Sequence, residues 1–166
     1  VLISYAERYG ISDEKICEAM YVAAGIGSVI AQRASISGAQ GGCQAEIGSA
    51  AGMAAAAAAY LMGQTPEMIM NSCALAIKNM LGLACDPVAG LVEVPCVKRN
   101  AAGALNAVMA ADMSMAGIKS VIPADEVIDA MGEIGSLMPS SIKETSKAGL
   151  AVTKTGAKIA ACQRHF

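Results

Sequence analysis

Residues 44–62 read QAEIGSAAGMAAAAAAYLM, a stretch in which Ala, Gly and Ser predominate. The segment 47–66 carries no charged side chain, so a membrane span has to be considered. A bilayer span needs roughly 20 predominantly apolar residues, but Leu61 is the only large aliphatic residue after Ile47 in this segment. We therefore interpret the stretch as a buried helix whose small side chains let neighbouring helices pack closely, and we expect no membrane association.

Helical signals continue on both sides of this stretch, whereas strict alternation of apolar and polar residues is hard to find. A helix is expected to start at Thr65, Pro66 and Glu67. The Thr side chain can cap the helix N-terminus, Pro is tolerated in the first turn, and the negative charge of Glu is favourable at the positive end of the helix dipole. Prolines and glycines interrupt residues 83–97, which are expected to form a structured loop. We predict helices over residues 12–33, 44–62, 65–80, 98–115 and from 123 onward, with short helices or turns at 140–147 and from 155.

The predicted fold class is therefore all-α: one compact bundle of about five to seven helices with a structured Cys/Pro/Gly loop, formed by residues 1–166. Cys17 and Cys73 fall within amphipathic helices and are interpreted as core thiols. The face of the first long helix that should meet the core consists of Ile16, Met20, Ala23, Ala24 and Gly27.

The charge composition argues against nucleic-acid binding. The net charge is −2 and the pI is near 5.4, so the chain lacks the excess of positive charge that is typical of nucleic-acid-binding proteins. The chain begins at Val1 without the charged and hydrophobic segments of a signal peptide, so we expect a cytoplasmic protein, a fragment of a longer enzyme. In a reducing compartment, the six cysteines are either free buried thiols or metal ligands.

Three of these cysteines lie in contexts that core thiols do not need. Cys43 follows two glycines at a predicted helix start, and Cys85 and Cys96 lie on the irregular loop beside prolines. Backbone N–H groups at such places stabilise thiolates. Their spacing matches neither a zinc ribbon nor a ferredoxin. On this chemistry alone, a metal site with an open position and three inert buried thiols both remain possible.

Longer motifs carry a family resemblance. Residues 78–100 read KNMLGLACDPVAGLVEVPCVKRN, residues 41–48 read GGCQAEIG, and Lys143-Glu144-Thr145 precedes a second short motif at residues 149–151. Together they resemble the α chain of the iron–sulfur-dependent L-serine dehydratases, and the similarity runs over about residues 25–156.

The resemblance implies a four-iron, four-sulfur (4Fe-4S) cluster held by Cys43, Cys85 and Cys96, with one iron free of protein thiolate. Such an iron acts as a Lewis acid on the serine hydroxyl. Loss of water then gives aminoacrylate, which yields pyruvate and ammonia without pyridoxal phosphate. The general base is expected upstream of Val1. The expected partners are L-serine, a β domain or β chain of the same enzyme, and further copies in a homo-oligomer.

The other polar residues have less specific contexts. Arg99 and Asn100 follow a cluster ligand near a helix start, where they either receive the substrate carboxylate or cap the helix. Gln44, Glu46 and Asp86 either orient ligands or satisfy backbone donors. Lys78 and Asn79 fit a helix end. His165, the only histidine, lies too near the terminus to be a good base. Cys162 is a possible fourth ligand from the C-terminal tail, the alternative being a thiol that packs or faces solvent.

Two other functions remain open. A related iron–sulfur lyase, such as an L-cysteine desulfidase, could use the same cluster on a thiol leaving group. A non-catalytic helical interaction domain with incidental thiols is the alternative outside enzymes.

Overall fold

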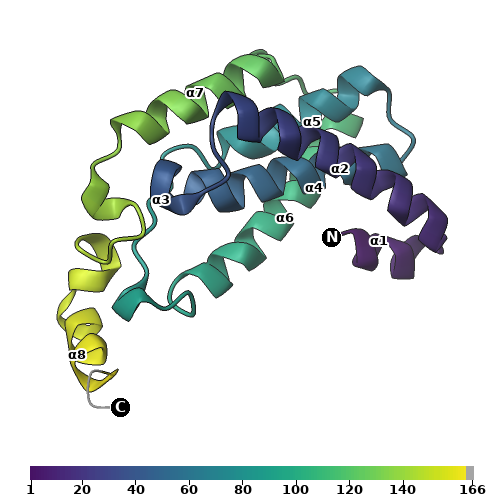
Figure 1. Cartoon of the computed structure of the whole chain (residues 1–166). Coiled ribbons are helices and arrows are strands. Elements are labelled where there is room, and N and C mark those ends of the chain that lie inside the picture. The colour runs from purple at the N-terminus through teal and green to yellow at the C-terminus, as the bar shows by residue number, and fades with distance from the viewer. Residues whose placement is uncertain (164–166) are drawn as a thin grey trace.

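The computed structural model describes residues 1–163, and within them the fold is all-α, as predicted (Figure 1). The only extended pairing in this part of the chain is an isolated bridge between Cys85 and Lys143. Eight α-helices are separated by one short π-helical and three short 3₁₀-helical segments. The α-helices are α1 (Leu2–Tyr9), α2 (Asp13–Arg33), α3 (Gly38–Gly41), α4 (Ser49–Leu61), α5 (Pro66–Lys78), α6 (Cys96–Met115), α7 (Ala124–Leu137) and α8 (Lys154–Gln163).

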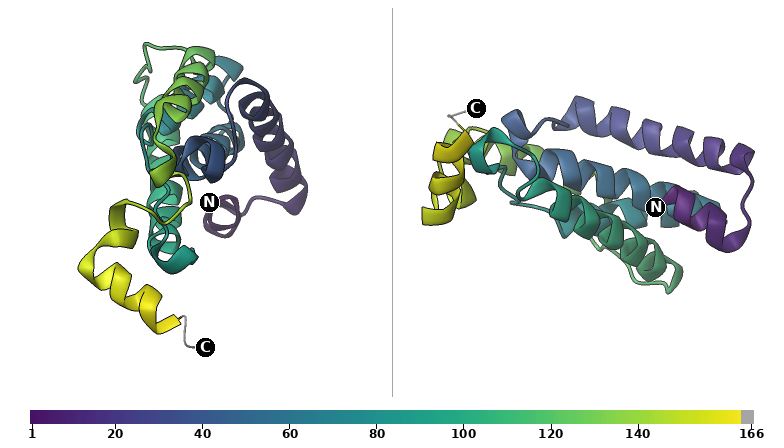
Figure 2. Two further views of the ribbon diagram at one scale, coloured as in Figure 1. Left: turned by 60° about the vertical axis from the view of Figure 1, so that its left-hand side comes forward. Right: turned by 90° about the horizontal axis from the view of Figure 1, so that it is seen from below.

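Helix α4 is the centre of the bundle. It packs against α2, α5 and α6, and α2, α4 and α6 run side by side in the second view of Figure 2. The five alanines at 55–59 are fully buried, so the small-residue stretch is the inner helix that the sequence predicts. Gly52 allows α5 to approach closely, because a Cβ at that position would lie 2.8 Å from the Ile77 side chain. None of the described helices is long and apolar enough to span a bilayer.

Local signals set several helix ends. The Thr65 hydroxyl accepts a hydrogen bond from the Met68 N–H at 3.4 Å, and Pro66 opens α5 as expected. The Ser12 hydroxyl likewise accepts from the Lys15 N–H at the start of α2. The predicted helix over 44–62 is divided, because a π-helical segment, η1 (Gln44–Gly48), precedes α4. Helices α1 and α3 were not predicted.

Predictions about three residues of α2 are wrong. Met20 is 58% exposed, Ala24 is exposed, and Cys17 is also exposed rather than buried in the core. The buried residues of α2 are instead Ala19, Ile26 and Ile30. The reason is a rotation of the buried stripe, since α2 packs chiefly on α4 and directs Ile26 and Ile30 into the core that α4, α5 and α7 share.

Cys73 is a core thiol, as predicted, and replacing it should cost stability. Its side chain is fully buried on α5, and burial raises the pKa of the thiol to about 12. Cys73→Ser should lower the free energy of unfolding by about 1–3 kcal/mol, because the new hydroxyl would lie among apolar side chains. Cys17→Ser is the matched control, and its exposed site predicts a change within about 0.5 kcal/mol. Equal losses in denaturant titrations of the two variants would contradict this prediction.

Candidate metal centre

The fold brings Cys43, Cys85 and Cys96 together from three separate segments. Cys43 lies between α3 and η1, Cys85 lies on the loop after α5, and Cys96 is the first residue of α6. Cys43 is 0% and Cys85 2% exposed, and Cys96 is partly buried against them. Ile47 and Leu83 complete this small cluster. Three soft sulfur donors therefore converge in one small cluster with two apolar side chains.

Gln44 ties the Cys43 segment to the loop that carries Cys85. Its side-chain amide donates to the Met131 carbonyl at 2.9 Å, and its amide oxygen accepts from the Gly82 N–H at 2.9 Å. The Gln44 backbone N–H donates to the Leu83 carbonyl at 3.1 Å. The sequence left two roles for Gln44, orienting ligands or satisfying backbone donors. In the structure its side chain forms hydrogen bonds with backbone groups. These hydrogen bonds fix the position of Cys43 relative to the loop that carries Cys85.

The Lys143-Glu144-Thr145 motif and the residues after it hold the Cys85 loop from the other side. The Cys85 N–H donates to the Ile142 carbonyl at 2.9 Å, and the Glu144 N–H donates to the Cys85 carbonyl at 2.8 Å. The Ser146 hydroxyl donates to the Pro87 carbonyl at 2.6 Å. Residues 142–146 thus run along residues 85–87 and fix their backbone. The sequence marks this motif but does not indicate which segment it contacts.

Asp86 and Arg99 lie directly behind the thiols. Arg99 Nη1 is 2.9 Å from Asp86 Oδ1, donates to the Ala84 carbonyl at 2.7 Å and donates to Cys43 Sγ at 3.6 Å. The other carboxylate oxygen of Asp86 accepts from the Leu150 N–H at 2.8 Å. Gly149 has φ +63, and a Cβ there would overlap the carboxylate of Asp86. Arg99 therefore neutralises Asp86 and places positive charge next to a thiol.

Burial is the largest influence on the pKa values of the Cys85 and Cys96 thiols. Burial, followed by the charge of Cys43 and a hydrogen-bonding contact with it, raises the pKa of the Cys85 thiol. The same causes raise the pKa of the Cys96 thiol, against the lowering effect of Arg99. Without metal these thiols are protonated at neutral pH, so a metal that binds them must displace protons.

Glu46 joins the same site. Its carboxylate and the sulfur atoms of Cys43 and Cys85 all lie within 4.8 Å of one another. This triplet forms a possible metal-ligating group within the part of the chain that the structure describes. Because three thiols and one carboxylate can supply soft and hard ligands at once, the donor set fits an iron–sulfur centre.

The remaining predicted site residues are outside the cysteine cluster itself. Asn100 is exposed on α6, one residue after Arg99. Cys162 is exposed on α8, which packs on η2 (Val88–Gly90) within the loop between Cys85 and Cys96, but the thiol is not part of the cysteine cluster. Lys78 donates to the Ser120 carbonyl and Asn79 to the Asn106 side chain, which are structural contacts. His165 lies outside the described residues.

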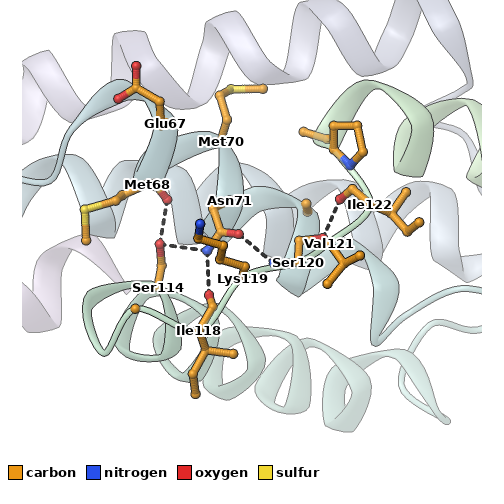
Figure 3. Close-up of a pocket in the computed structure, with 14 residues that line it drawn as sticks. Glu67, Met68, Met70, Asn71, Ser114, Ile118, Lys119, Ser120, Val121 and Ile122 are labelled. Atoms are coloured by element: carbon orange, nitrogen blue, oxygen red, sulfur yellow. Dashed lines mark hydrogen bonds between the residues drawn. The ribbon is translucent and has the colours of Figure 1, made fainter.

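A separate cavity of about 520 Å³ lies between α5, α6 and the start of α7 (Figure 3). Asn71 occupies its wall, where its amide donates to the Ser114 hydroxyl and the Ile118 carbonyl and accepts from the Ser120 N–H. Ser114 and Cys96 are at opposite ends of α6, about 27 Å apart at 1.5 Å per residue. This cavity is therefore not part of the cysteine site.

Comparison with known proteins agrees with this geometry. A family model described as serine dehydratase alpha chain matches residues 1–151, which include all three clustered cysteines. The chain belongs to the serine dehydratase alpha chain family. The iron–sulfur resemblance seen in the motifs therefore identified the correct family.

Several curated relatives are similar to this chain over nearly its whole length. The probable L-serine dehydratase alpha chain of Bacillus subtilis is 56% identical over 158 residues, covering 95% of this chain and 53% of that protein. The L-serine dehydratase alpha chain of Peptoniphilus asaccharolyticus is 46% identical over 159 residues, with coverages of 96% and 54%. L-serine dehydratase 2 of Escherichia coli is 40% identical over 164 residues, with coverages of 97% and 35%. This chain thus spans about half the length of the separate alpha chains it matches, and a third of the longer protein.

Proposed function

We propose that the complete protein containing this chain is an L-serine dehydratase, a lyase that converts L-serine to pyruvate and ammonia. The observation that carries this proposal is that Cys43, Cys85 and Cys96 come together from three segments of a chain of this family. The side chains of Cys43 and Cys85 are buried. The relatives bear the name L-serine dehydratase. Their separate alpha chains support a β chain or β domain as partner of this one, and free buried thiols support a cytoplasmic setting.

In this proposal the three cysteines hold a 4Fe-4S cluster. When bound, the cluster supplies a Lewis-acidic iron that makes the substrate hydroxyl a better leaving group. The chain's own residues hold this site in place. Ile47 and Leu83 pack against the cysteines, Gln44 and residues 142–146 fix the two loops, and Arg99 places its positive charge beside Cys43.

Arg99 has a second proposed role as receptor of the substrate carboxylate. Its Nη1 is engaged by Asp86, Ala84 and Cys43, so a carboxylate would have to use the remaining guanidinium donors. Asn100, exposed one residue later, is the companion candidate. Cys162 remains the proposed fourth ligand in the resting enzyme, because α8 already packs on the loop between Cys85 and Cys96.

The test is anaerobic reconstitution of the complete protein, followed by iron and acid-labile sulfide analysis and steady-state assays. We expect about four irons and four sulfides per chain and turnover of L-serine well above that of L-threonine and L-cysteine. Faster release of sulfide from L-cysteine would identify a desulfidase instead. A colourless protein without iron would identify a non-catalytic helical domain and overturn the proposal.

A further inference from the structure

We propose that Glu46 receives the α-ammonium group of the amino acid substrate and so selects amino acids over other hydroxylated acids. This inference rests on the proposed function, because it assigns a recognition group to the same site. Glu46 is the residue that would recognise the amino group.

The position of Glu46 is set by the fold beside the thiols. It lies on η1, three residues after Cys43, and its carboxylate is within 4.8 Å of the sulfur atoms of both Cys43 and Cys85. Gly38 of α3 leaves room for this carboxylate, since a Cβ there would lie 2.8 Å from Glu46 Oε2. A side chain at residue 38 would push the carboxylate away from its place beside the thiols.

The charge of Glu46 has no counterpart in the site. Ion pairs within residues 1–163 join Lys15 to Glu18, Arg33 to Asp129 and Arg99 to Asp86, and none includes Glu46. Arg99 is the cation of the cysteine site, but its Nη1 is already held by Asp86. When metal is bound the cysteines are thiolates, so the nearby carboxylate of Glu46 adds to the negative charge of the site, and a cation bound beside Glu46 offsets this charge. The site is therefore complementary to a small cationic group.

The α-ammonium of an amino acid is such a group. It offers three N–H donors and no acceptor, and a carboxylate offers acceptors only, so the two form charge-assisted hydrogen bonds. In serine the ammonium-bearing carbon is bonded directly to the carbon that carries the hydroxyl. An anchor within a few ångströms of the cysteines would therefore hold the amino group while the hydroxyl faces the metal centre. An acid lacking the amino group would gain nothing from Glu46.

The test uses equilibrium binding of two unreactive or poorly reactive ligands to the complete, cluster-loaded enzyme. L-alanine retains the ammonium and lacks the hydroxyl, whereas 3-hydroxypropanoate retains the hydroxyl and lacks the ammonium. In Glu46→Gln, the dissociation constant of L-alanine measured by calorimetry should rise on the order of tenfold to a hundredfold. That of 3-hydroxypropanoate should stay within about twofold, and the KM for L-serine should rise with that of L-alanine. Glu46→Asp, which keeps the charge and shortens the side chain, should lie between Gln and the natural residue.

Glu133→Gln is the matched control, because it removes one carboxylate from an exposed position on α7. It should leave both dissociation constants unchanged. Equal weakening of the two ligands by Glu46→Gln, or weakening of neither, would overturn the ammonium assignment. Loss of iron from Glu46→Gln would also overturn it, since Glu46 would then support the cluster and not the substrate. A natural protein that binds a cluster but does not turn over L-serine would instead refute the proposed function, a result visible before any variant is made.

Discussion

Ser in place of Cys43, Cys85 or Cys96 should abolish L-serine turnover in the complete protein and bleach its cluster absorption. A Ser hydroxyl is a harder donor than a thiolate and ionises far less readily, so it is a poor substitute for a cluster ligand. Two of the three sites are also enclosed, so solvent cannot easily supply a replacement ligand. Iron and acid-labile sulfide per chain, measured after anaerobic reconstitution, should fall together with activity.

The control for these variants is Cys17→Ser. Cys17 is exposed on α2, far in sequence from the cluster segments and outside the cysteine cluster, so its removal should change neither iron content nor turnover. Full iron content in the Cys85→Ser protein would contradict the assignment of that residue as a ligand. Loss of iron in Cys17→Ser would show that cluster loss is not specific to the three converging thiols.

The elements that sequence alone predicts are those governed by neighbouring residues. The start of α5 follows from the Thr65 cap and Pro66, and the burial of α4 follows from its run of alanines. The unusual settings of Cys43, Cys85 and Cys96 were also visible, because glycine and proline beside a cysteine are local features. These patterns sufficed for the fold class and marked the three cysteines as unusual, but their assignment as ligands came from the family resemblance.

What the sequence did not predict depends on contacts between distant segments. The exposure of Cys17 and Met20 is decided by which face of α2 packs against α4 and α7, a rotation that the periodicity of α2 alone leaves undetermined. The path of residues 142–146 along the Cys85 loop is made by backbone hydrogen bonds, which leave little trace in side-chain pattern. The nearness of Glu46 to Cys85 likewise arises only when the two loops meet.

Arg99 illustrates the same limit in the site itself. The sequence places it at a helix start, where a guanidinium would be free to face a ligand. Helix α6 in fact begins at Cys96, so Arg99 is three residues further along and its Nη1 contacts Asp86 and Cys43. Its first function in this structure is therefore to neutralise a buried acid, and any contact with substrate comes in addition to that.

The Asp86–Arg99 pair consequently makes a strong prediction about stability. The side chains are 7% and 21% exposed, and Asp86 also accepts the Leu150 N–H. In Asp86→Asn the shape is retained, but the charge is lost and one of the two side-chain positions becomes an N–H donor. Either Arg99 or the Leu150 N–H then loses its acceptor. Breaking a buried pair of this kind costs about 3–5 kcal/mol, and the loss should appear in equilibrium unfolding.

The effect should also be local and should reach the metal centre. Without the Asp86 contacts, residues 142–150 lose one of their attachments to the Cys85 loop, so limited proteolysis there should accelerate and iron retention should fall. Asp129→Asn provides the matched control, because it breaks the Arg33–Asp129 pair, whose side chains are 41% and 52% exposed. Exposed pairs contribute about 0–1 kcal/mol, so this variant should unfold almost as the natural protein does. If Asp86→Asn costs no more than Asp129→Asn, the pair behind the cysteines does not hold the loop, and another contact must fix the position of Cys85.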